Sequence, residues 1–389
     1  MVRHCCKKGN RQQTIIKVLA SNTNKTKERQ IARQSVLKSC WSAAAVAALL
    51  VSHAPVDAQT LSELIAGAKI ESEMSFVAGP TTFGGRQAFA ELQAAFNKKF
   101  SLNARLNLTA GPSMPAMAAR IITEAKAGRK SSTDIHLGPP ATHAELHNGR
   151  LLERVNYSRI FPWVTKEMEI LPGDTVLVYT SLQGILYNSN LLPRDKAPKT
   201  YEDLVDPRLS RSWEGKMAIP PYSSWLVELS LLWGEKKVLD YLHKLLPLSA
   251  GQVRYGEIEE RVSSGEFLVM ANSGSAVEGM WEWQAKGAPL VGVTASDPVL
   301  TSYFQLGVPK NSAHPNLAKL FVAFMASPEA QRIVDKYEKR SSHLVEGTRM
   351  AKYVKENRLK LQSASDLIAS FHEGKGLEFR AELTNMLKP

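Results

Sequence analysis

Cysteine is nearly absent from this chain. Three of its 389 residues are cysteines, Cys5, Cys6 and Cys40, and all of them precede residue 58. The residues that follow therefore offer no disulfide, no thiolate metal site and no cysteine nucleophile. A chain of this length can bury enough apolar surface to fold without disulfides.

Motifs for catalysis and long apolar runs are also missing. No stretch after residue 58 is apolar over 18 residues, so we expect no membrane span there. No G-x-S-x-G nucleophile motif occurs. Gly79 and Gly84 have the spacing of a phosphate-binding P-loop, but Gly85 and Arg86 follow where a lysine and a hydroxyl residue are required. We therefore expect no catalytic residues, no cofactor and no nucleotide hydrolysis.

The positive charge is concentrated in one segment. The formal net charge is +12, and residues 1–58 contain ten Lys and Arg against two acids, which leaves +4 for the rest. That remainder has no dense stripe of Lys and Arg, and binding to phosphate backbones requires clustered cations. We expect no nucleic-acid partner.

The basic segment has the features of a secretory leader. Lys38 precedes an apolar run over residues 41–51, and Val56-Asp57-Ala58 offers small residues for cleavage before Gln59. The basic lead-in is longer than usual, which places the true start near residue 36 or 37. We predict export to the periplasm. An uncleaved leader that anchors the protein to the membrane is the alternative.

Strand and helix patterns alternate after the leader. Residues 75–78 are typical of a strand, and residues 83–99 place apolar side chains at helical spacing. Two short apolar runs at 175–179 and 184–187 predict two further strands. The alternation predicts an α/β fold with largely parallel strands. The tail, residues 346–389, is predicted to be helical with breaks and to have no core face along its whole length.

Two longer motifs carry a family resemblance. Residues 200–207 read TYEDLVDP and residues 213–220 read WEGKMAIP; residues 314–321 read HPNLAKLF and residues 327–331 read SPEAQ. In this order they resemble motifs of bacterial extracellular solute-binding proteins of family 1, the receptors of ABC importers that include an iron(III) group. The resemblance covers roughly residues 70 to 340.

The resemblance implies a fold and a function. The fold would be a two-lobe, periplasmic-binding-protein-like type II α/β fold, with crossing strands at 175–187 and 296–308. It implies a monomer that holds a small-molecule or ion ligand and delivers it to an ABC permease in the inner membrane. The expected divisions are the lead-in and signal peptide at 1–58, the first part of lobe one at 59–180, lobe two at 185–298, the return of lobe one at 304–345, and the tail at 346–389.

One loop joins a predicted strand to a predicted helix in lobe one. We expect Thr81, Thr82 and Phe83 in this loop to bind ligand, because hydroxyls and free N–H groups at a helix start suit acceptor oxygens. A turn shaped only for packing is the alternative.

Further candidates lie in lobe two and at the crossings. Prolines end a strand before a hydroxyl-rich helix start at 220–225, and a similar loop follows at 271–275. N-caps and core aromatics are the alternative interpretation. The candidate ligand-binding residues here are Gln183, Tyr222, Ser223, Ser224, Trp225, Asn272, Ser273 and Tyr303.

We expect no metal site. Iron(III) members of the family supply two adjacent tyrosines, and this sequence has no such pair, although Tyr222, Tyr255 or Tyr303 could still offer oxygen ligands. His143 and His147 lie one helical turn apart, with His136 nearby, as a possible metal edge. We prefer a solvated surface helix as the explanation of that pair.

Three functions remain open at this stage. The preferred one is an exported receptor for an ABC importer. The alternatives are a sensory binding protein that docks on a membrane receptor, and a periplasmic enzyme on the same fold.

Overall fold

A computed structural model describes residues 59–171, 173–363 and 375–388. By its internal contacts the chain divides into residues 1–58 and residues 59–389. The predicted lead-in and signal peptide lie outside the described residues, as does the part of the tail between 364 and 374. Among the helices that the structure describes, none is long and apolar enough to cross a membrane.

Helices and strands alternate over most of the described chain. The α-helices are α2 (Leu61–Glu71), α3 (Gly85–Phe100), α4 (Met114–Lys126), α5 (Pro140–Asn148), α6 (Tyr157–Ile160), α7 (Pro207–Ser210), α8 (Ser224–Trp233), α9 (Glu235–Leu245), α10 (Ile258–Ser263), α11 (Ala276–Gln284), α12 (Pro315–Met325), α13 (Pro328–Glu338), α14 (Arg349–Glu356) and α16 (Lys375–Met386). The strands are β1 (Glu73–Ala78), β2 (Arg105–Ala110), β3 (His136–Gly138), β4 (Thr175–Leu182), β5 (Gly184–Asn188), β6 (Met217–Ile219), β7 (Ser249–Gln252), β8 (Val269–Ser273), β9 (Leu290–Val293), β10 (Val299–Gly307) and β11 (Leu361–Ser363).

Lobe one is built around strands β1 to β4 and the second half of β10. β1 pairs with β2 in parallel, while β3 and β4 both pair antiparallel to β10. Helix α3 repeats apolar residues at helical spacing, so Phe89 and Phe96 face the core. There they meet Phe321 of α12 at ring-centroid distances of 5.8 and 5.7 Å. This aromatic cluster holds α3 and α12 together.

Lobe two contains a five-stranded sheet in the order β7-β6-β8-β5-β9. Tyr201, Trp213 and Trp225 are at most 1% exposed in its core. Helix α8 is apolar over most of its length because it packs inside this lobe. The two lobes therefore have separate cores, each around its own sheet.

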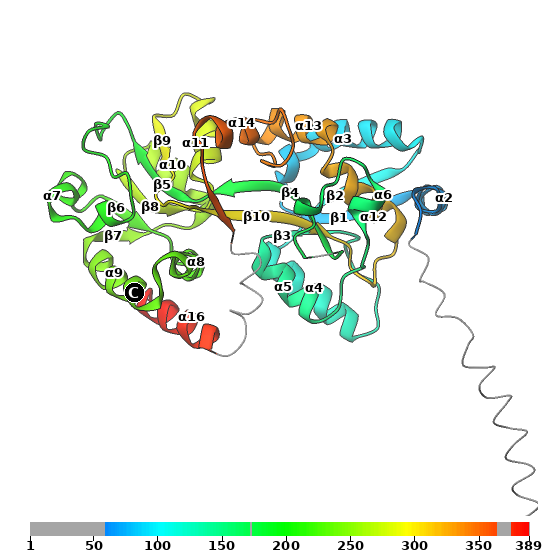
Figure 1. Cartoon of the computed structure of the whole chain (residues 1–389), viewed down its shortest axis with the longest axis horizontal. Helices are drawn as coiled ribbons and strands as arrows, with labels where there is room; N and C mark the ends of the chain where they lie inside the picture. The colour runs from blue at the N-terminus through cyan, green and yellow to red at the C-terminus, as the bar shows by residue number, and fades with distance from the viewer. Residues whose placement is uncertain (1–58, 172, 364–374, 389) are drawn as a thin grey trace, which may run out of the picture. The chain divides into compact units, whose positions relative to one another are not determined.

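Two crossing strands join the lobes. β4 and β10 run antiparallel and pair from Thr175 opposite Gly307 to Leu182 opposite Thr301. Figure 1 shows them side by side between the two lobes. Gln183 alone separates β4 from β5, which continues into the sheet of lobe two. The two-lobe fold with crossing strands, expected from the resemblance, is what the structure has.

The prediction of largely parallel strands is wrong. β1/β2, β6/β7, β6/β8 and β10/β11 are parallel, but β3/β10, β4/β10, β5/β8 and β5/β9 are antiparallel. The crossings are the physical reason, because β10 returns to lobe one against the direction of β4. The sheets are therefore mixed.

The tail does have a core face, which corrects the sequence-based expectation. Phe379, Leu383 and Leu387 are at most 4% exposed and pack in the core of lobe two. A spacing of four residues places Phe379 and Leu383 on one side of α16, and Leu387 follows directly after the helix. Further back in the tail, β11 pairs in parallel with β10 at Val299–Thr301.

Candidate functional site

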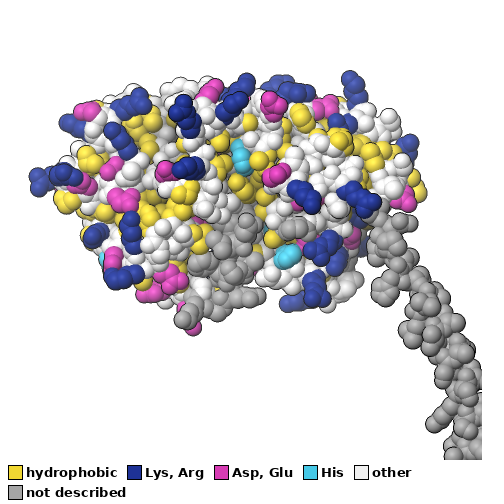
Figure 2. All heavy atoms as spheres, in the orientation of Figure 1, with side chains coloured by type: hydrophobic (Ala, Val, Ile, Leu, Met, Phe, Trp, Pro, Cys, Tyr) yellow, Lys and Arg dark blue, Asp and Glu magenta, His cyan; other side chains and the backbone are white. Residues whose placement is uncertain are grey.

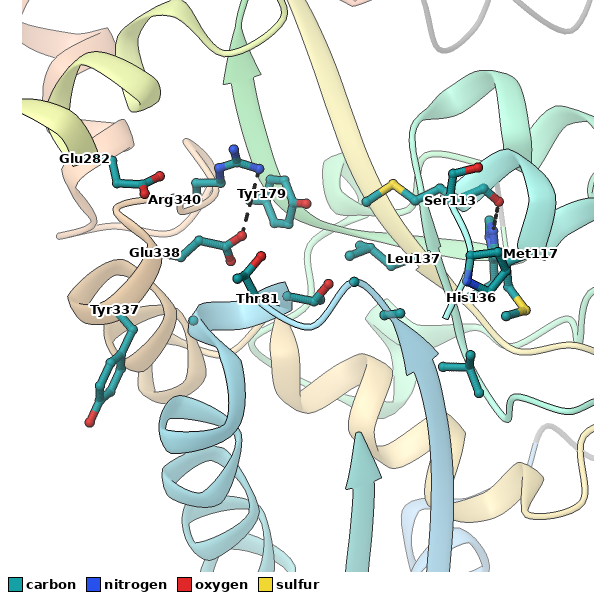
Figure 3. Close-up of a pocket in the computed structure, with 17 residues that line it drawn as sticks. Thr81, Ser113, Met117, His136, Leu137, Tyr179, Glu282, Tyr337, Glu338 and Arg340 are labelled. Atoms are coloured by element: carbon teal, nitrogen blue, oxygen red, sulfur yellow. Dashed lines mark hydrogen bonds and ion pairs between the residues drawn. The ribbon is translucent and has the colours of Figure 1, made fainter. Parts of the chain in front are cut away.

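A cavity of about 530 Å³ lies where lobe one meets lobe two. The loop after β1 contributes Thr81 and Thr82 to its wall, and Glu282 on α11 is the residue that lobe two contributes. Figure 3 shows Glu282, Arg340, Glu338 and Tyr179 at one end of the cavity and His136 with Met117 at the other. The cavity thus has an acidic end and a less polar end.

The loop after β1 is held by its own backbone. The N–H of Thr82 donates to the carbonyl of Gly79, and the N–H of Gly84 donates to the carbonyl of Thr81, both at 3.0 Å. Thr81 is exposed and Thr82 is 7% exposed at the cavity wall. Both predicted residues therefore present side chains at the cavity.

Phe83 plays a different part from its two neighbours. Its φ of 57° places it in the left-handed region, which is costly for a residue with a side chain. The ring is fully buried, 5.8 Å from Phe76 and 6.5 Å from Tyr179 between centroids. Phe83 does not line the cavity; it packs beneath the loop, and this burial offsets the strained backbone.

The last residue of α13 is Glu338, and Arg340 follows just after the helix. Lys339 ends the helix with φ of 56°, and this reversal brings Arg340 back beside Glu338. The guanidinium Nη1 lies 3.9 Å from a carboxylate oxygen of Glu338, and its central carbon lies 5.7 Å from the ring centroid of Tyr179. Nε of Arg340 and Oε2 of Glu338 are both buried and have no hydrogen-bond partner among the described residues.

Helix α11 brings two more carboxylates to this end. The Glu278 carboxylate accepts the N–H of Leu182 at 3.3 Å, and burial raises the pKa of Glu278 to about 7. Glu282 pairs with Lys286 at 2.8 Å and is 38% exposed at the cavity rim. The Glu259 carboxylate from α10 lies against Gly279, and burial raises its pKa as well.

The other end of the cavity holds a neutral histidine pair. Nε2 of His136 lies 3.1 Å from the carbonyl oxygen of Met114, and its Nδ1 lies 3.2 Å from Nε2 of His143. Burial lowers the pKa of His136 to about 4 and that of His143 well below the ordinary value. Because the carbonyl can only accept, His136 donates through Nε2 and accepts from His143 through Nδ1.

His143 and His147, the pair that the sequence suggested, do not form one side of a metal site. His143 faces His136 in the interior, whereas His147 pairs with Asp174 at 2.6 Å. Nowhere in the described ranges do three or more His, Cys, Asp or Glu side chains gather as metal ligands.

Several of the predicted lobe-two residues are part of the packing. Trp225 is 1% exposed and packs on Tyr201 at 5.9 Å. Ser223 is 6% exposed and shares a 2.8 Å hydrogen bond with Thr384 of α16. Asn272 is fully buried, and its carbonyl oxygen accepts from the hydroxyl of Tyr201 at 2.6 Å.

The remaining predicted residues are spread between a tyrosine pair, the crossings and a loop. Tyr222 is 41% exposed and faces Tyr255 at 4.9 Å, and Ser224 is exposed beside it. Ser273 is buried at the end of β8, where its Oγ accepts the N–H of Ser275 at 3.3 Å. The Tyr303 ring stacks on His343 at 5.5 Å.

Gln183 sits at the joint between the crossings. Its Nε2 donates to Oγ of Ser302 at 3.1 Å and to the carboxylate of Glu228. Burial raises the pKa of Glu228 to about 7. The hinge is thus held from lobe two by two carboxylates, the buried Glu278 at Leu182 and the half-buried Glu228 at Gln183.

Sequence reasoning missed the acidic end of the cavity. Glu338-Lys339-Arg340 looks like a solvated helix end, and Glu282 like one more charge on an exposed helix face. The reversal at Lys339 brings Arg340 beside Glu338, and the fold of lobe two brings Glu282 on α11 to the same cavity. Tyr179 was missed because it ends the short apolar run at 175–179, which predicts only a strand.

The comparisons with known proteins agree with this geometry. The family model described as bacterial extracellular solute-binding protein matches residues 91–340, which is more than half of the chain. The chain therefore belongs to the bacterial extracellular solute-binding protein family. No curated protein sequence matches it.

Solved structures match the fold at low sequence identity. The periplasmic binding protein P5PA matches with a TM-score of 0.63 and 20% identity, over 82% of this chain and 100% of that one. Iron-bound HitA from Pseudomonas aeruginosa matches with a TM-score of 0.63 and 20% identity, over 80% and 99%. AfuA from Actinobacillus pleuropneumoniae, with fructose-6-phosphate bound, matches with a TM-score of 0.61 and 18% identity, over 80% and 96%.

Proposed function

We propose that this protein is an exported receptor that captures a small ligand in the cavity between its lobes and delivers it to an ABC permease in the inner membrane. The observation that carries the proposal is the cavity itself, which both lobes line in a chain of the solute-binding family. Its volume of about 530 Å³ is within the range of small-molecule sites. The ligand is carried, not turned over, as in other transport binding proteins of this family.

Thr81 and Thr82 are the proposed contacts from lobe one, together with Arg340 and Tyr179. Their hydroxyl and guanidinium groups offer hydrogen bonds to a polar solute. Glu282 is the proposed contact from lobe two. A solute that touches both Thr81 and Glu282 gains more from the closed form than from the open one, so it shifts the lobes toward closure.

The crossings provide the hinge for this closure. Gln183 is the single residue between β4 and β5, and the paired β10 strand runs beside it. Hinges of this kind absorb a rotation in a few residues at element ends. Small-angle scattering with and without a bound solute tests the motion, and identical curves would contradict it.

Several properties of the mature receptor belong to the same proposal. We expect a monomer in the periplasm, with the leader removed before Gln59, and no nucleic-acid partner. On the face shown in Figure 2, Lys and Arg side chains are scattered among acidic ones instead of forming a stripe. N-terminal sequencing of the protein recovered from the periplasm tests the cleavage.

A thermal-shift panel tests solute capture directly. The panel contains ferric citrate, phosphate, sulfate, molybdate, polyamines, thiamine, sugars and organic acids. A ligand at about a hundred times its Kd adds roughly 2.7 kcal/mol to the free energy of unfolding, which raises the melting temperature measurably. Thr82→Ala should weaken any hit that occupies the cavity, whereas Glu145→Gln, on the exposed face of α5, should not.

The panel also has an outcome that contradicts the proposal. A hit that Thr82→Ala and Arg340→Lys both leave unchanged would place the solute outside this cavity. Chemical conversion of a hit during incubation, followed by mass spectrometry, would favour an enzyme.

A further inference from the structure

The ion pair at the acidic end of the cavity is incomplete. Arg340 and Glu338 approach only to 3.9 Å, which is beyond hydrogen-bond distance. Each keeps a buried polar atom without a partner among the described residues, the Nε–H donor of Arg340 and the Oε2 acceptor of Glu338. Leaving such groups buried and unpaired is unfavourable, and the free Oε2 acceptor of Glu338 in particular needs a donor from a third group.

The charge balance at this end is negative. Among the charged residues described along the cavity wall, Arg340 is the one cation, and it faces Glu338 and Glu282. Behind the wall, Glu278 also lies close enough to Arg340 for the guanidinium to oppose the effect of burial on its pKa. Lys286, an exposed residue just after α11, offsets Glu282.

Burial acts on these carboxylates in one direction. It raises the pKa of Glu338 and of Glu259; Arg340 opposes this at both carboxyls, and proximity to Glu282 adds to it. The positive charge of one arginine is therefore not enough to keep all of these glutamates ionised. An anionic solute would meet more repulsion here, whereas a cationic one would relieve it.

Resting on the solute capture proposed above, we propose that the ligand carries an ammonium group, which binds at the acidic end between Glu338 of lobe one and Glu282 of lobe two. An ammonium has three donors and no acceptor, so it can bond Oε2 of Glu338 and the Glu282 carboxylate together. Figure 3 shows both side chains near Arg340, at the same end of the cavity. Because the ammonium bonds to both lobes, it favours the closed form.

A series of four-carbon compounds separates the effect of the ammonium group on binding from the effects of ligand size and shape. The full chain is titrated by calorimetry and thermal shift with putrescine, 4-aminobutanoate, succinate and 1,4-butanediol at up to 10 mM. The expected result is stabilisation by putrescine, by 4-aminobutanoate or by both, and none by succinate or butanediol. Stabilisation by succinate or butanediol alone, or by none of the four, overturns the inference.

Charge variants tie the binding to this end of the cavity. Glu282→Gln keeps the shape and removes the charge, and it should raise the Kd of the responding amine tenfold to a hundredfold, the loss expected for a charge-assisted hydrogen bond. Glu260→Gln, an exposed acid on α10, makes the same change in net charge and should leave the Kd unchanged. Equal effects of the two variants would overturn the inference.

The same measurements separate this inference from the proposed function. If no amine binds but another panel compound does, and Thr82→Ala weakens it, solute capture stands and the ammonium subsite is wrong. If no compound of any class binds, both fail. Binding of an amine that both Thr82→Ala and Glu282→Gln weaken supports both.

Discussion

Two loops of this protein share one sequence pattern and have different surroundings. In each lobe a strand ends, hydroxyl residues follow and a helix begins, at Thr81–Thr82 in lobe one and at Ser223–Ser224 in lobe two. The first loop opens on the cavity. In the second, Ser223 is covered by α16 and bonded to Thr384, and Trp225 fills the core of lobe two.

The difference arises from what the rest of the chain places over each loop. Lobe one leaves the start of α3 facing the crossings, with Phe83 beneath the loop. Lobe two receives the C-terminal helix, whose buried residues Phe379 and Leu383 belong to the same core as Trp225. A hydroxyl-rich helix start is therefore a binding loop only where no other element covers it.

The largest expected effect comes from the lobe-two loop. Trp225→Ala removes a fully buried side chain and should reduce the free energy of unfolding by about 3–5 kcal/mol in a urea titration. Tyr222→Ala, three residues earlier and 41% exposed, should cost less than about 1 kcal/mol. Equal losses would mean that the two aromatics are buried alike, contrary to this structure.

A pH titration probes the carboxylate that lobe two places on the hinge. The pKa of Glu228 is about 7 in the folded protein and about 4.5 when unfolded, so the folded state binds the proton more tightly. Stability from this group is thus greatest below pH 4.5 and falls as the pH rises through 7, by about 3 kcal/mol. Glu278 shifts in the same direction and adds to the fall.

Glu228→Gln removes that part of the pH dependence. Glutamine can still accept the hydrogen bond from Gln183, so the variant should be more stable than the wild type at pH 8 and about equal at pH 4. Urea titrations at the two pH values measure the difference. A variant that is less stable at pH 8 would show that the ionised carboxylate stabilises the hinge.

Local patterns were enough to predict much of the fold. The runs predicted as strands at 75–78, 175–179 and 184–187 lie within β1, β4 and β5, and the helical pattern at 83–99 overlaps α3, because each segment has a clear apolar pattern. The strand directions could not be read in this way, since they depend on where the chain crosses between lobes. The core face of α16 was visible as the spacing of Phe379, Leu383 and Leu387, but the rest of the tail obscured it.

The candidate site was predictable only on its lobe-one side. Thr81 and Thr82 lie at the cavity because their strand-to-helix loop, a feature visible in the sequence, stays uncovered in lobe one. Glu282 and Arg340 come from helices and turns distant in sequence, and nothing local distinguishes them from surface charges. Their place at the cavity depends on the tertiary fold.

A glycine pair in the lobe-one loop tests how tightly that loop is packed. Gly84 has φ of 89°, and an added Cβ would overlap the Cβ of Tyr337 on α13, so Gly84→Ala should cost about 1–3 kcal/mol. Gly79→Ala in the same loop would meet only Oγ1 of Thr82 at 3.4 Å. It should cost less than about 1 kcal/mol in the same urea titration. Similar losses in both variants would contradict the close approach at Gly84.

Two substitutions with small expected effects on stability show most directly which of the two loops binds the solute. Ser223→Ala breaks the bond to Thr384 in a buried place and should cost about 0.5–1.5 kcal/mol, with no effect on the Kd of a solute held in the cavity. Thr81→Ala changes an exposed residue, so the free energy of unfolding should stay within about 0.5 kcal/mol while that Kd rises. Urea denaturation gives the free energy of unfolding of each variant, and calorimetry gives the Kd of each for the solute. If Ser223→Ala weakens the solute and Thr81→Ala does not, the binding loop is the one in lobe two, and α16 must leave it when the solute binds.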